Sequence, residues 1–406
     1  MKRITPQSSR YRATSWRRHV RQIISTMEYY SFRFFGADNC PFGQSGALAI
    51  AAFTVSIITG LILLFSYVPT TDMGLAGLHD LSGRSFNGFL TAAHRASADI
   101  LVLIIVFHLI RNWAGERFRG PRSRNWMKGL VALPLIGLIG WSGYVLPWDA
   151  RAMVLVAWGR ELATSPDRWP ILGWLHLGTL FSAPIFSAGN QADLLTRIFM
   201  LHVGGAILLT WLVMWHLKRV TPPRIVLPVR AWIILVGLIL LVAQMMPLHG
   251  RVEKPFNLFV TPATVHIDLI IGFPFLFYNI LGAELLGAVI LIVWLGLALL
   301  PKLEPQRIFA ACVDEAACDG CRLCLQDCPY GAIAMVEVCD AGGVGNDREV
   351  AQVLPAYCNA CGICVGACED DAIELPDFRS SEIVSRIDAV LAKSEGEHFS
   401  VKGETE

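Results

Sequence analysis

Two pairs of histidines lie at the same spacing in two apolar stretches of membrane length. His94 and His108 are 14 residues apart, and so are His202 and His216. At about 100° per residue, 14 steps end roughly 40° short of four full turns, so both imidazoles of a pair share one helix face, about 21 Å apart. Imidazole is a standard axial ligand of haem iron. Two such helices side by side would hold two stacked haems, each between two histidines, and would carry electrons across a bilayer.

Glycines repeat the same interval in two other apolar stretches. A single histidine in an apolar helix is more often a hydrogen-bonded structural residue or a proton carrier than a ligand, but two pairs of equal spacing are harder to explain in that way. Gly46 and Gly60 are also 14 residues apart, as are Gly129 and Gly143. A residue without a side chain lets a backbone approach a flat macrocycle closely. Although glycine is common in membrane helices, we expect these stretches to flank the same two haems.

Eight of the eleven cysteines form two copies of one pattern in the C-terminal part. Each copy reads C-x2-C-x2-C-x3-C, the signature of bacterial two-cluster 4Fe-4S ferredoxins, in which the fourth cysteine of each copy ligates the other cluster. The expected ligand sets are Cys318, Cys321, Cys324 and Cys368 for one cluster, and Cys358, Cys361, Cys364 and Cys328 for the other. Zinc is the alternative for any C-x2-C pair. Cys312 and Cys339 fall outside the pattern, so we expect no cluster role for them.

Six apolar runs are long enough to cross a membrane. They cover residues 45–67, 89–112, 128–147, 196–217, 231–248 and 278–300. The basic N-terminal arm and the basic loops at 117–128 and 218–230 then lie on one side, which the positive-inside rule assigns to the cytoplasm. Both termini would be cytoplasmic, and the expected location is a bacterial inner membrane. The arm has no short apolar run with a cleavage site, so we interpret it as a surface segment rather than a signal peptide.

Charge divides the chain into two modules of different kinds. Residues 1–300 contain 26 Lys and Arg against 13 Asp and Glu, a net charge of +13, whereas residues 301–406 contain 8 against 20, a net charge of −12. The first module is apolar enough to lie largely in lipid. The acidic module suits docking of a basic cytoplasmic redox partner, with a solvated acidic surface as the alternative. Its cysteine spacing suits clusters in a reducing compartment, and nothing indicates a nucleic-acid partner.

We therefore predict an all-α transmembrane bundle of about six spans with a four-helix dihaem core, followed by a small α+β ferredoxin domain. The expected parts are a basic arm with a surface helix at 1–44, the dihaem core at 45–220, a two-span part at 221–300, a linker at 301–317, the two-cluster domain at 318–376 and a tail at 377–406. Pro301 and Pro305 should end the last span. The long interval between the two cysteine motifs predicts an inserted loop near 340–349. The sequence has no dinucleotide-binding glycine fingerprint, so catalysis on a nicotinamide would need another subunit.

Over about residues 20–300, the chain resembles the cytochrome b family of bc-type quinol-oxidising complexes. The likeness is carried by the four histidines, the four glycines, His94-Arg95-Ala96-Ser97-Ala98, Gly143-Tyr144-Val145-Leu146-Pro147-Trp148-Asp149 and Leu195-Thr196-Arg197. The resemblance implies that His94 and His202 hold the haem near the positive side, and that the other pair holds the cytoplasmic-side haem. It makes Arg95 and Arg111 candidate partners of haem propionates, although Arg111 could equally be a positive-inside anchor.

The resemblance also implies quinone sites. The family oxidises quinol at the positive side, between a Pro-Trp loop and a Pro-Glu-Trp-Tyr motif. Pro147 and Trp148 supply the loop, but His266-Ile267-Asp268-Leu269 stands where the motif is expected. Quinol oxidation releases two protons, so Asp268 and His266 are the catalytic candidates; a helix-capping Asp268 is the alternative. A cytoplasmic-side quinone pocket is implied by resemblance only.

Cys40 precedes the first span. Some members of the family attach an extra haem through one cysteine in that region, but the corresponding position is Gln44, four residues away. Cys40 is therefore either the attachment point of an extra covalent haem or a plain free thiol.

The predicted function is a membrane electron-transfer subunit that links the quinone pool, two b-type haems and two cytoplasmic 4Fe-4S clusters. The expected partners are other subunits of a membrane complex, such as a Rieske-type protein or a c-type cytochrome, and a second copy of the chain. The alternative is a membrane anchor that relays electrons for a cytoplasmic dehydrogenase, without quinol oxidation at the positive side. The changed Pro-Glu-Trp-Tyr region favours the anchor, and the intact Pro-Trp loop favours the quinol site.

Overall fold

The computed structural model describes residues 15–36, 40–69, 71, 86–119, 122–169, 173–217, 227–245, 270, 272–303, 310–328, 330–338, 348–355, 357–358, 360–375, 385 and 388. The chain divides into two compact units. One is built from Met1–Phe118 and Asn125–Leu300, and the other from Arg119–Arg124 and Pro301–Glu406. We call them the membrane unit and the cysteine unit and describe each by itself.

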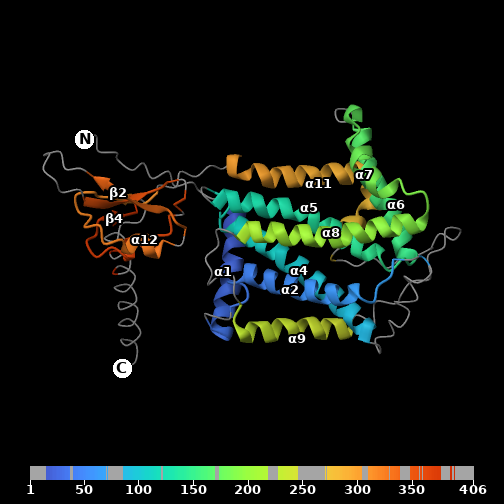
Figure 1. Ribbon diagram of the computed structural model, residues 1–406, viewed down its shortest axis with the longest axis horizontal. Helices are drawn as coiled ribbons and strands as arrows, with labels where there is room; N and C mark the ends of the chain where they lie inside the picture. Colours follow the sequence, from blue (N-terminus) through green and yellow to red (C-terminus); the bar gives the residue numbers. More distant parts are fainter. Residues whose placement is uncertain are drawn as a thin grey trace, which may run out of the picture. The chain divides into compact units, whose positions relative to one another are not determined.

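Among the described residues, five helices are long and apolar enough to cross a membrane. They are α2 (Ser45–Leu64), α4 (Phe86–Ala114), α5 (Ser123–Val145), α8 (Gln191–Leu217) and α11 (Tyr278–Leu303). Helix α9 (Val229–Met245) is also apolar but has only 17 residues, so the sixth predicted span is present as a shorter helix. The six helices run along one another in Figure 1. The chain is thus a mostly helical, multi-pass membrane protein.

The membrane unit buries small side chains and exposes large apolar ones. Ala51 and Ala52 of α2 and Ala93 and Ala96 of α4 are at most 4% exposed and belong to one core cluster. Small residues let neighbouring helices approach closely in a bilayer, where apolar side chains gain little from leaving lipid. By contrast, Trp211 on α8 is 62% exposed. This inside-out distribution is the one that a helix bundle in lipid requires.

Helices α5 and α11 are joined by two reciprocal hydrogen bonds. Proline lacks an N–H group, so Pro301 in α11 leaves the carbonyl of Leu297, four residues earlier, without its helical donor. Trp126 of α5 donates to that carbonyl through Nε1 at 2.8 Å. Pro134 in α5 leaves the carbonyl of Leu130 without a donor in the same way.

Trp294 of α11 completes the reciprocal pair by donating to the carbonyl of Leu130 at 2.9 Å. The prediction that Pro301 ends the last span was wrong, because α11 continues to Leu303. The carbonyl that Pro301 leaves free is satisfied from the neighbouring helix rather than by a break in the chain. The two bonds also align the C-terminal end of α11 with the N-terminal end of α5.

Helix α1 (Ser15–Phe35) lies across one end of the bundle (Figure 1). Arg17, Ile24 and Ser31 recur at seven-residue intervals and are its buried face. Arg17 forms an ion pair with Glu116 at 3.5 Å, just beyond the end of α4. The surface helix predicted within residues 1–44 is therefore present, and it covers the end of the bundle where α4 ends and α5 begins.

The opposite end carries the short helices that follow α5 (Figure 1). They are α6 (Ala150–Thr164), η2 (Ser165–Arg168), η3 (Gly173–Leu175) and α7 (Leu177–Phe186), and α10 (Phe273–Leu276) precedes α11. Asp167 fixes the start of α7, because its carboxylate accepts hydrogen bonds from the amides of Gly178 and Thr179 at 2.6 and 2.7 Å and from the Thr179 hydroxyl. These bonds, above all that from the hydroxyl, lower the pKa of Asp167.

The cysteine unit contains two small antiparallel sheets and two short helices among its described residues. Strand β1 (Cys312–Val313) pairs with β4 (Ile373–Glu374), and β2 (Ile333–Val338) pairs with β3 (Arg348–Val353). The helices are α12 (Leu323–Asp327) and α13 (Ile363–Gly366). These small α and β elements match the expected composition of a compact α+β unit.

Two boundaries in this unit differ from those expected. Strand β1 lies within residues 301–317, which were predicted to be a linker, and its pairing with β4 means that the folded part begins before the first cysteine motif. The insertion expected near 340–349 ends in β3, because Arg348 and Glu349 pair with β2. Residues 339–347 and most of the helix expected at 381–392 lie outside the described residues.

Candidate metal centres

The four predicted histidine ligands form two facing pairs between helices α4 and α8. His94 and His108 are on α4, whereas His202 and His216 are on α8. The rings of His94 and His202 have their centres 6.2 Å apart and are inclined at 73°. His108 and His216 are close enough for their charges to interact. The structure thus brings together the same residues that the 14-residue spacing pairs.

The spacing of the His94 and His202 rings suits one metal ion between them. Two metal–nitrogen bonds of about 2 Å, with about 1.1 Å from each nitrogen to its ring centre, would separate the ring centres by about 6 Å. The observed 6.2 Å agrees with this value. A direct ring contact could produce a similar separation, so the hydrogen bonds of the two rings are needed to tell which nitrogen is available.

The Nδ1 atoms of these two rings are engaged by neighbouring helices. Nδ1 of His94 lies 3.0 Å from the carbonyl oxygen of Ser56, and Nδ1 of His202 lies 3.0 Å from that of Ile139. A carbonyl oxygen can only accept, so Nδ1 must carry the proton in both rings. The lone pair is then on Nε2, which is the atom that an axial ligand presents to haem iron.

The four predicted glycines face the four histidines. A Cβ atom added to Gly60 would lie 2.9 Å from Cε1 of His94, and one added to Gly143 would lie 2.9 Å from Cε1 of His202. The corresponding separations are 3.4 Å for Gly46 and His108 and 3.5 Å for Gly129 and His216. Helices α2 and α5 therefore approach the histidines most closely where only glycine fits. The donor chemistry and these close approaches fit two haems.

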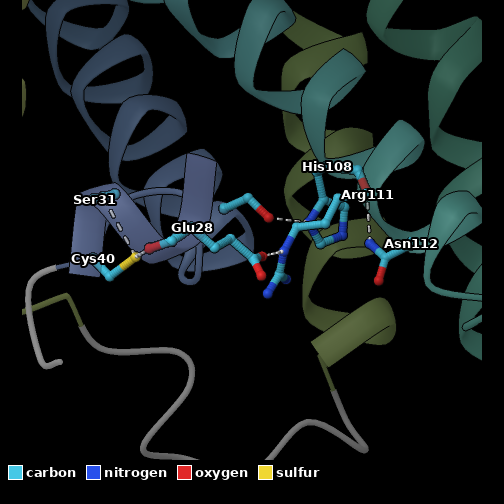
Figure 2. A network of polar contacts seen from close by, with 7 residues as sticks. Glu28, Ser31, Cys40, His108, Arg111 and Asn112 are labelled. Carbon is cyan, nitrogen blue, oxygen red and sulfur yellow. Dashed lines mark hydrogen bonds and ion pairs between the residues drawn. The ribbon is translucent and has the colours of Figure 1, made fainter. Parts of the chain in front are cut away.

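The two arginines predicted to face haem propionates have protein partners. Arg95 donates from Nε to the hydroxyl of Tyr144 at 3.1 Å, and its guanidinium carbon lies 4.4 Å from that ring centre. Arg111 forms an ion pair with Glu28 of α1 at 2.5 Å (Figure 2). The Glu28 contact supports the anchoring role of Arg111, because it ties the surface helix to the end of α4.

Cys40 lies close to this ion pair but engages other atoms. Its side chain is buried, and Sγ lies 3.4 Å from the hydroxyl of Ser31 and 3.7 Å from the carbonyl of Glu28 (Figure 2). A thiol held in this way between two polar groups of α1 suits the free-thiol interpretation. No described contact of Cys40 favours a covalent haem.

The Pro-Trp loop joins α5 to α6 in a fixed conformation. Trp148 is 2% exposed and has a positive φ of 53°. Asp149 caps α6 by accepting from the amides of Arg151 and Ala152, and its carboxylate forms a buried ion pair with Arg151 at 2.7 Å. Pro147 lies in this turn. The other two catalytic candidates, His266 and Asp268, lie outside the described residues.

Two tyrosines near this loop were not predicted from the sequence. The hydroxyl of Tyr67 donates to the carbonyl of Leu146 at 2.8 Å and so holds the loop to the end of α2. The hydroxyl of Tyr278 donates to the carboxylate of Glu161, and the Tyr278 ring stacks on Trp158 with the ring centres 4.8 Å apart. Neither tyrosine belongs to a repeated spacing, so no sequence signal marked them.

The eight motif cysteines line two cavities in crossed sets of four. One cavity is lined by Cys318, Cys321, Cys324 and Cys368. The other is lined by Cys328, Cys358, Cys361 and Cys364. Each cavity thus receives three cysteines from one motif and the fourth from the other, which is the arrangement expected from the sequence.

The donor set of both cavities suits iron–sulfur clusters. Backbone amides donate to four of the sulfurs, for example from Ala332 to Cys328 and from Ala372 to Cys368, each at 3.3 Å. Burial raises the pKa of Cys364 to about 11, and neighbouring sulfurs raise it further, a charge penalty that iron would offset. Among the described residues, no three His, Cys, Asp or Glu side chains could hold a single metal ion, which disfavours zinc. Cys312 is exposed and outside both sets, and Cys339 is not described.

Comparisons with known proteins concern the membrane unit. A family model described as Cytochrome b/b6/petB matches residues 40–247. A solved structure described as a hyperthermophilic respiratory Complex III matches with 19% sequence identity and a TM-score of 0.49, over 70% of this chain and 80% of that chain. The matched region contains all four histidines and all four glycines.

Proposed function

The chain belongs to the cytochrome b/b6 family, and on that premise we propose that it is a membrane electron-transfer subunit of a quinone-linked redox complex. It would carry electrons between quinone, two b-type haems and two 4Fe-4S clusters. The observation that supports this most strongly is the pairing of histidines across α4 and α8, with ring centres 6.2 Å apart in one pair and glycines facing all four rings.

In this proposal His94 and His202 hold one haem, and His108 and His216 hold the other. When bound, haem iron takes up and releases single electrons. The protein orients the ligands, because Ser56 and Ile139 each accept from an Nδ1–H group and leave Nε2 for iron. The glycines leave room for the macrocycle edge, and the exposed apolar faces of the bundle keep both sites within lipid.

The crossed cysteine sets support two clusters in the same polypeptide. The chain leaves the bundle at the C-terminal end of α11, and the hydrogen bond between Trp126 and Leu297 joins that end to the start of α5. Gly129 near the start of α5 faces His216. The segment that leads to the cysteines therefore begins at the end of the bundle where His108 and His216 lie.

The same end of the bundle is basic. Helix α1, with its arginines, and the loop between α4 and α5 are both at this end. By the positive-inside rule this end faces the cytoplasm, which would place the clusters in a reducing compartment. The haem held by His108 and His216 is then the one from which electrons reach the clusters, or to which the clusters deliver them.

The haem assignment is tested by counting haems. The purified protein should show reduced-minus-oxidised b-type spectra at two haems per chain, and addition of quinone to the reduced, donor-free protein should reoxidise both. His202→Ala and His216→Ala should each retain one haem, because each pair has separate ligands. One haem or none in the unaltered protein would contradict the proposal.

Anaerobic iron and sulfide assays test the clusters separately. About eight iron atoms beyond those of haem are expected per chain, with EPR signals of two interacting 4Fe-4S clusters. Zinc in place of iron would contradict this part of the proposal and leave the haem assignment intact.

A second candidate is a membrane anchor that relays electrons for a cytoplasmic dehydrogenase. The observation that favours it is His266-Ile267-Asp268-Leu269 in place of the family's Pro-Glu-Trp-Tyr motif. Asp268→Asn distinguishes the two candidates. Slower quinol oxidation with unchanged haem content would support the quinol site, and unchanged turnover would support the anchor.

A further inference from the structure

Three of the four glycines that face histidines follow a residue whose hydroxyl oxygen contacts a histidine Nδ1 atom. These contacts are Ser45 with His108 at 3.1 Å, Thr59 with His94 at 3.0 Å and Ser142 with His202 at 3.2 Å. The residue before the fourth glycine, Gly129, is Lys128. The fourth histidine, His216, therefore has an ammonium group where the other three have a hydroxyl.

Lys128 is held against the helix turn that carries His216. Its Nζ atom donates to the carbonyl of Trp215 at 2.9 Å and lies 4.9 Å from the centre of the Trp215 ring. Its charge acts on His216, and the carbonyl of Asn125 lies toward the same ring. Within the described residues, however, Nδ1 of His216 completes no hydrogen bond. Both differences from the other three histidines occur at this one ligand.

Both differences change the charge at the metal in the same direction. With iron on Nε2, Nδ1 carries a proton, and a hydroxyl that accepts this proton makes the ring a stronger electron donor. Stronger donation stabilises ferric iron over ferrous iron. A missing acceptor weakens that donation, and a nearby ammonium charge disfavours the extra positive charge of the ferric state. Each change raises the reduction potential of the iron that His216 binds.

We propose that Lys128 is a positioning residue that raises the reduction potential of the iron between His108 and His216 above that of the iron between His94 and His202. This inference rests on the proposed function. Oxidation of ferrous iron at the His94 pair then reduces ferric iron at the His108 pair by one electron, with no other reactant. Lys128 thus directs electrons toward the end of the bundle from which the cysteine unit continues.

The test is a redox titration of both haems in the full-length protein, followed by their visible absorption. Lys128→Ser restores the hydroxyl of the repeat and should lower one midpoint, with about a tenfold change in the electron distribution between the haems, or about 59 mV for one-electron couples. Lys128→Gln removes only the charge and should lower the same midpoint less. Lys128→Arg keeps the charge and should change neither midpoint.

Ser142→Ala identifies which midpoint belongs to which haem, because it removes a hydroxyl only from His202 and should raise the other midpoint. Unchanged midpoints in both Lys128→Ser and Lys128→Gln, with two haems retained, would overturn the role of Lys128. An unaltered protein that lacks two haems would instead contradict the proposed function. Haem content measured in each variant separates a shifted potential from a lost haem.

Discussion

The membrane unit and the cysteine unit each bring together two ligand sets, but they link the two sets in opposite ways. In the membrane unit, each set takes one histidine from α4 and one from α8, and the sets are 14 residues apart on each helix. In the cysteine unit, each set takes three cysteines from one motif and the fourth from the other. Ligands on long helices can therefore be lost one set at a time, whereas ligands in interlocked loops depend on one another.

The largest expected effect is on the interlocked sets. Cys368 follows the second motif's other cysteines in the chain but lines the cavity of the first, and the strand after it, β4, pairs with β1. Cys368→Ala should remove one cluster and loosen the fold around the other, so that iron beyond haem falls from about eight atoms to four or fewer. The two haems should remain.

Cys312→Ala is the matched control for this loss, because Cys312 is exposed and lines neither cavity. It should keep all of the iron. Full iron content in Cys368→Ala would show that the sets are not crossed in this way.

The separate histidine sets can be compared through their glycines. Gly60→Ala would bring a methyl group to 2.9 Å from His94, whereas Gly46→Ala would leave 3.4 Å to His108. A Cβ atom at 2.9 Å forces the ring to shift, so Gly60→Ala should lose about half of the bound haem, and Gly46→Ala should keep most of it.

The control for both variants is Gly137→Ala on α5, where an added Cβ atom would meet no atom within 4 Å. Haem per chain, measured on purified protein, is the readout. Equal haem content in Gly60→Ala and Gly137→Ala would contradict the close approach of α2 to the ligand.

A smaller effect is expected where the membrane unit relies on hydrogen bonds between helices rather than on ligands. Trp294→Phe removes the donor to the Leu130 carbonyl that Pro134 leaves free. An unsatisfied buried carbonyl costs about 1–3 kcal/mol, so thermal unfolding should occur at lower temperature with haem content unchanged. Trp211→Phe, at an exposed position on α8, should leave the unfolding temperature unaltered.

The smallest effect concerns α7, which no ligand set includes. The Thr179 hydroxyl and two backbone amides lower the pKa of Asp167. The anchoring of α7 is therefore complete above the ordinary pKa of an aspartate, about 3.9, and is lost as the pH falls through the lowered value. Hydrogen exchange at Gly178 and Thr179 should accelerate over that range.

Asp167→Asn should remove this pH dependence and show faster exchange already at neutral pH. Protection of the two amides that stays constant through the acid range in the unaltered protein would contradict the role of the carboxylate.

The features that sequence could predict are those governed by repeated spacing. The histidine and glycine intervals follow from helix geometry, and the structure brings those residues together as the intervals indicate. The duplicated cysteine motif likewise predicted two crossed sets. In each case the ligand and its position are set by local geometry that the sequence states directly.

The features that sequence could not predict depend on how separate elements pack. Pro301 was expected to end a helix, but the Trp126 donor that satisfies the freed carbonyl comes from a helix about 170 residues earlier. The partner of Arg111 depends on where α1 packs, since Glu28 lies 83 residues away. The short strand β1 has no alternating pattern of its own and is fixed only by pairing with β4.

The central claim is that haems and clusters exchange electrons within one chain. We would reduce the clusters of the purified full-length protein with a low-potential donor, mix anaerobically, and follow b-haem absorbance by stopped flow at several protein concentrations. We predict a first-order reduction of haem whose rate does not depend on protein concentration and which is lost in Cys368→Ala. Haem reduction that scales with protein concentration, or that is unchanged in Cys368→Ala, would contradict the claim.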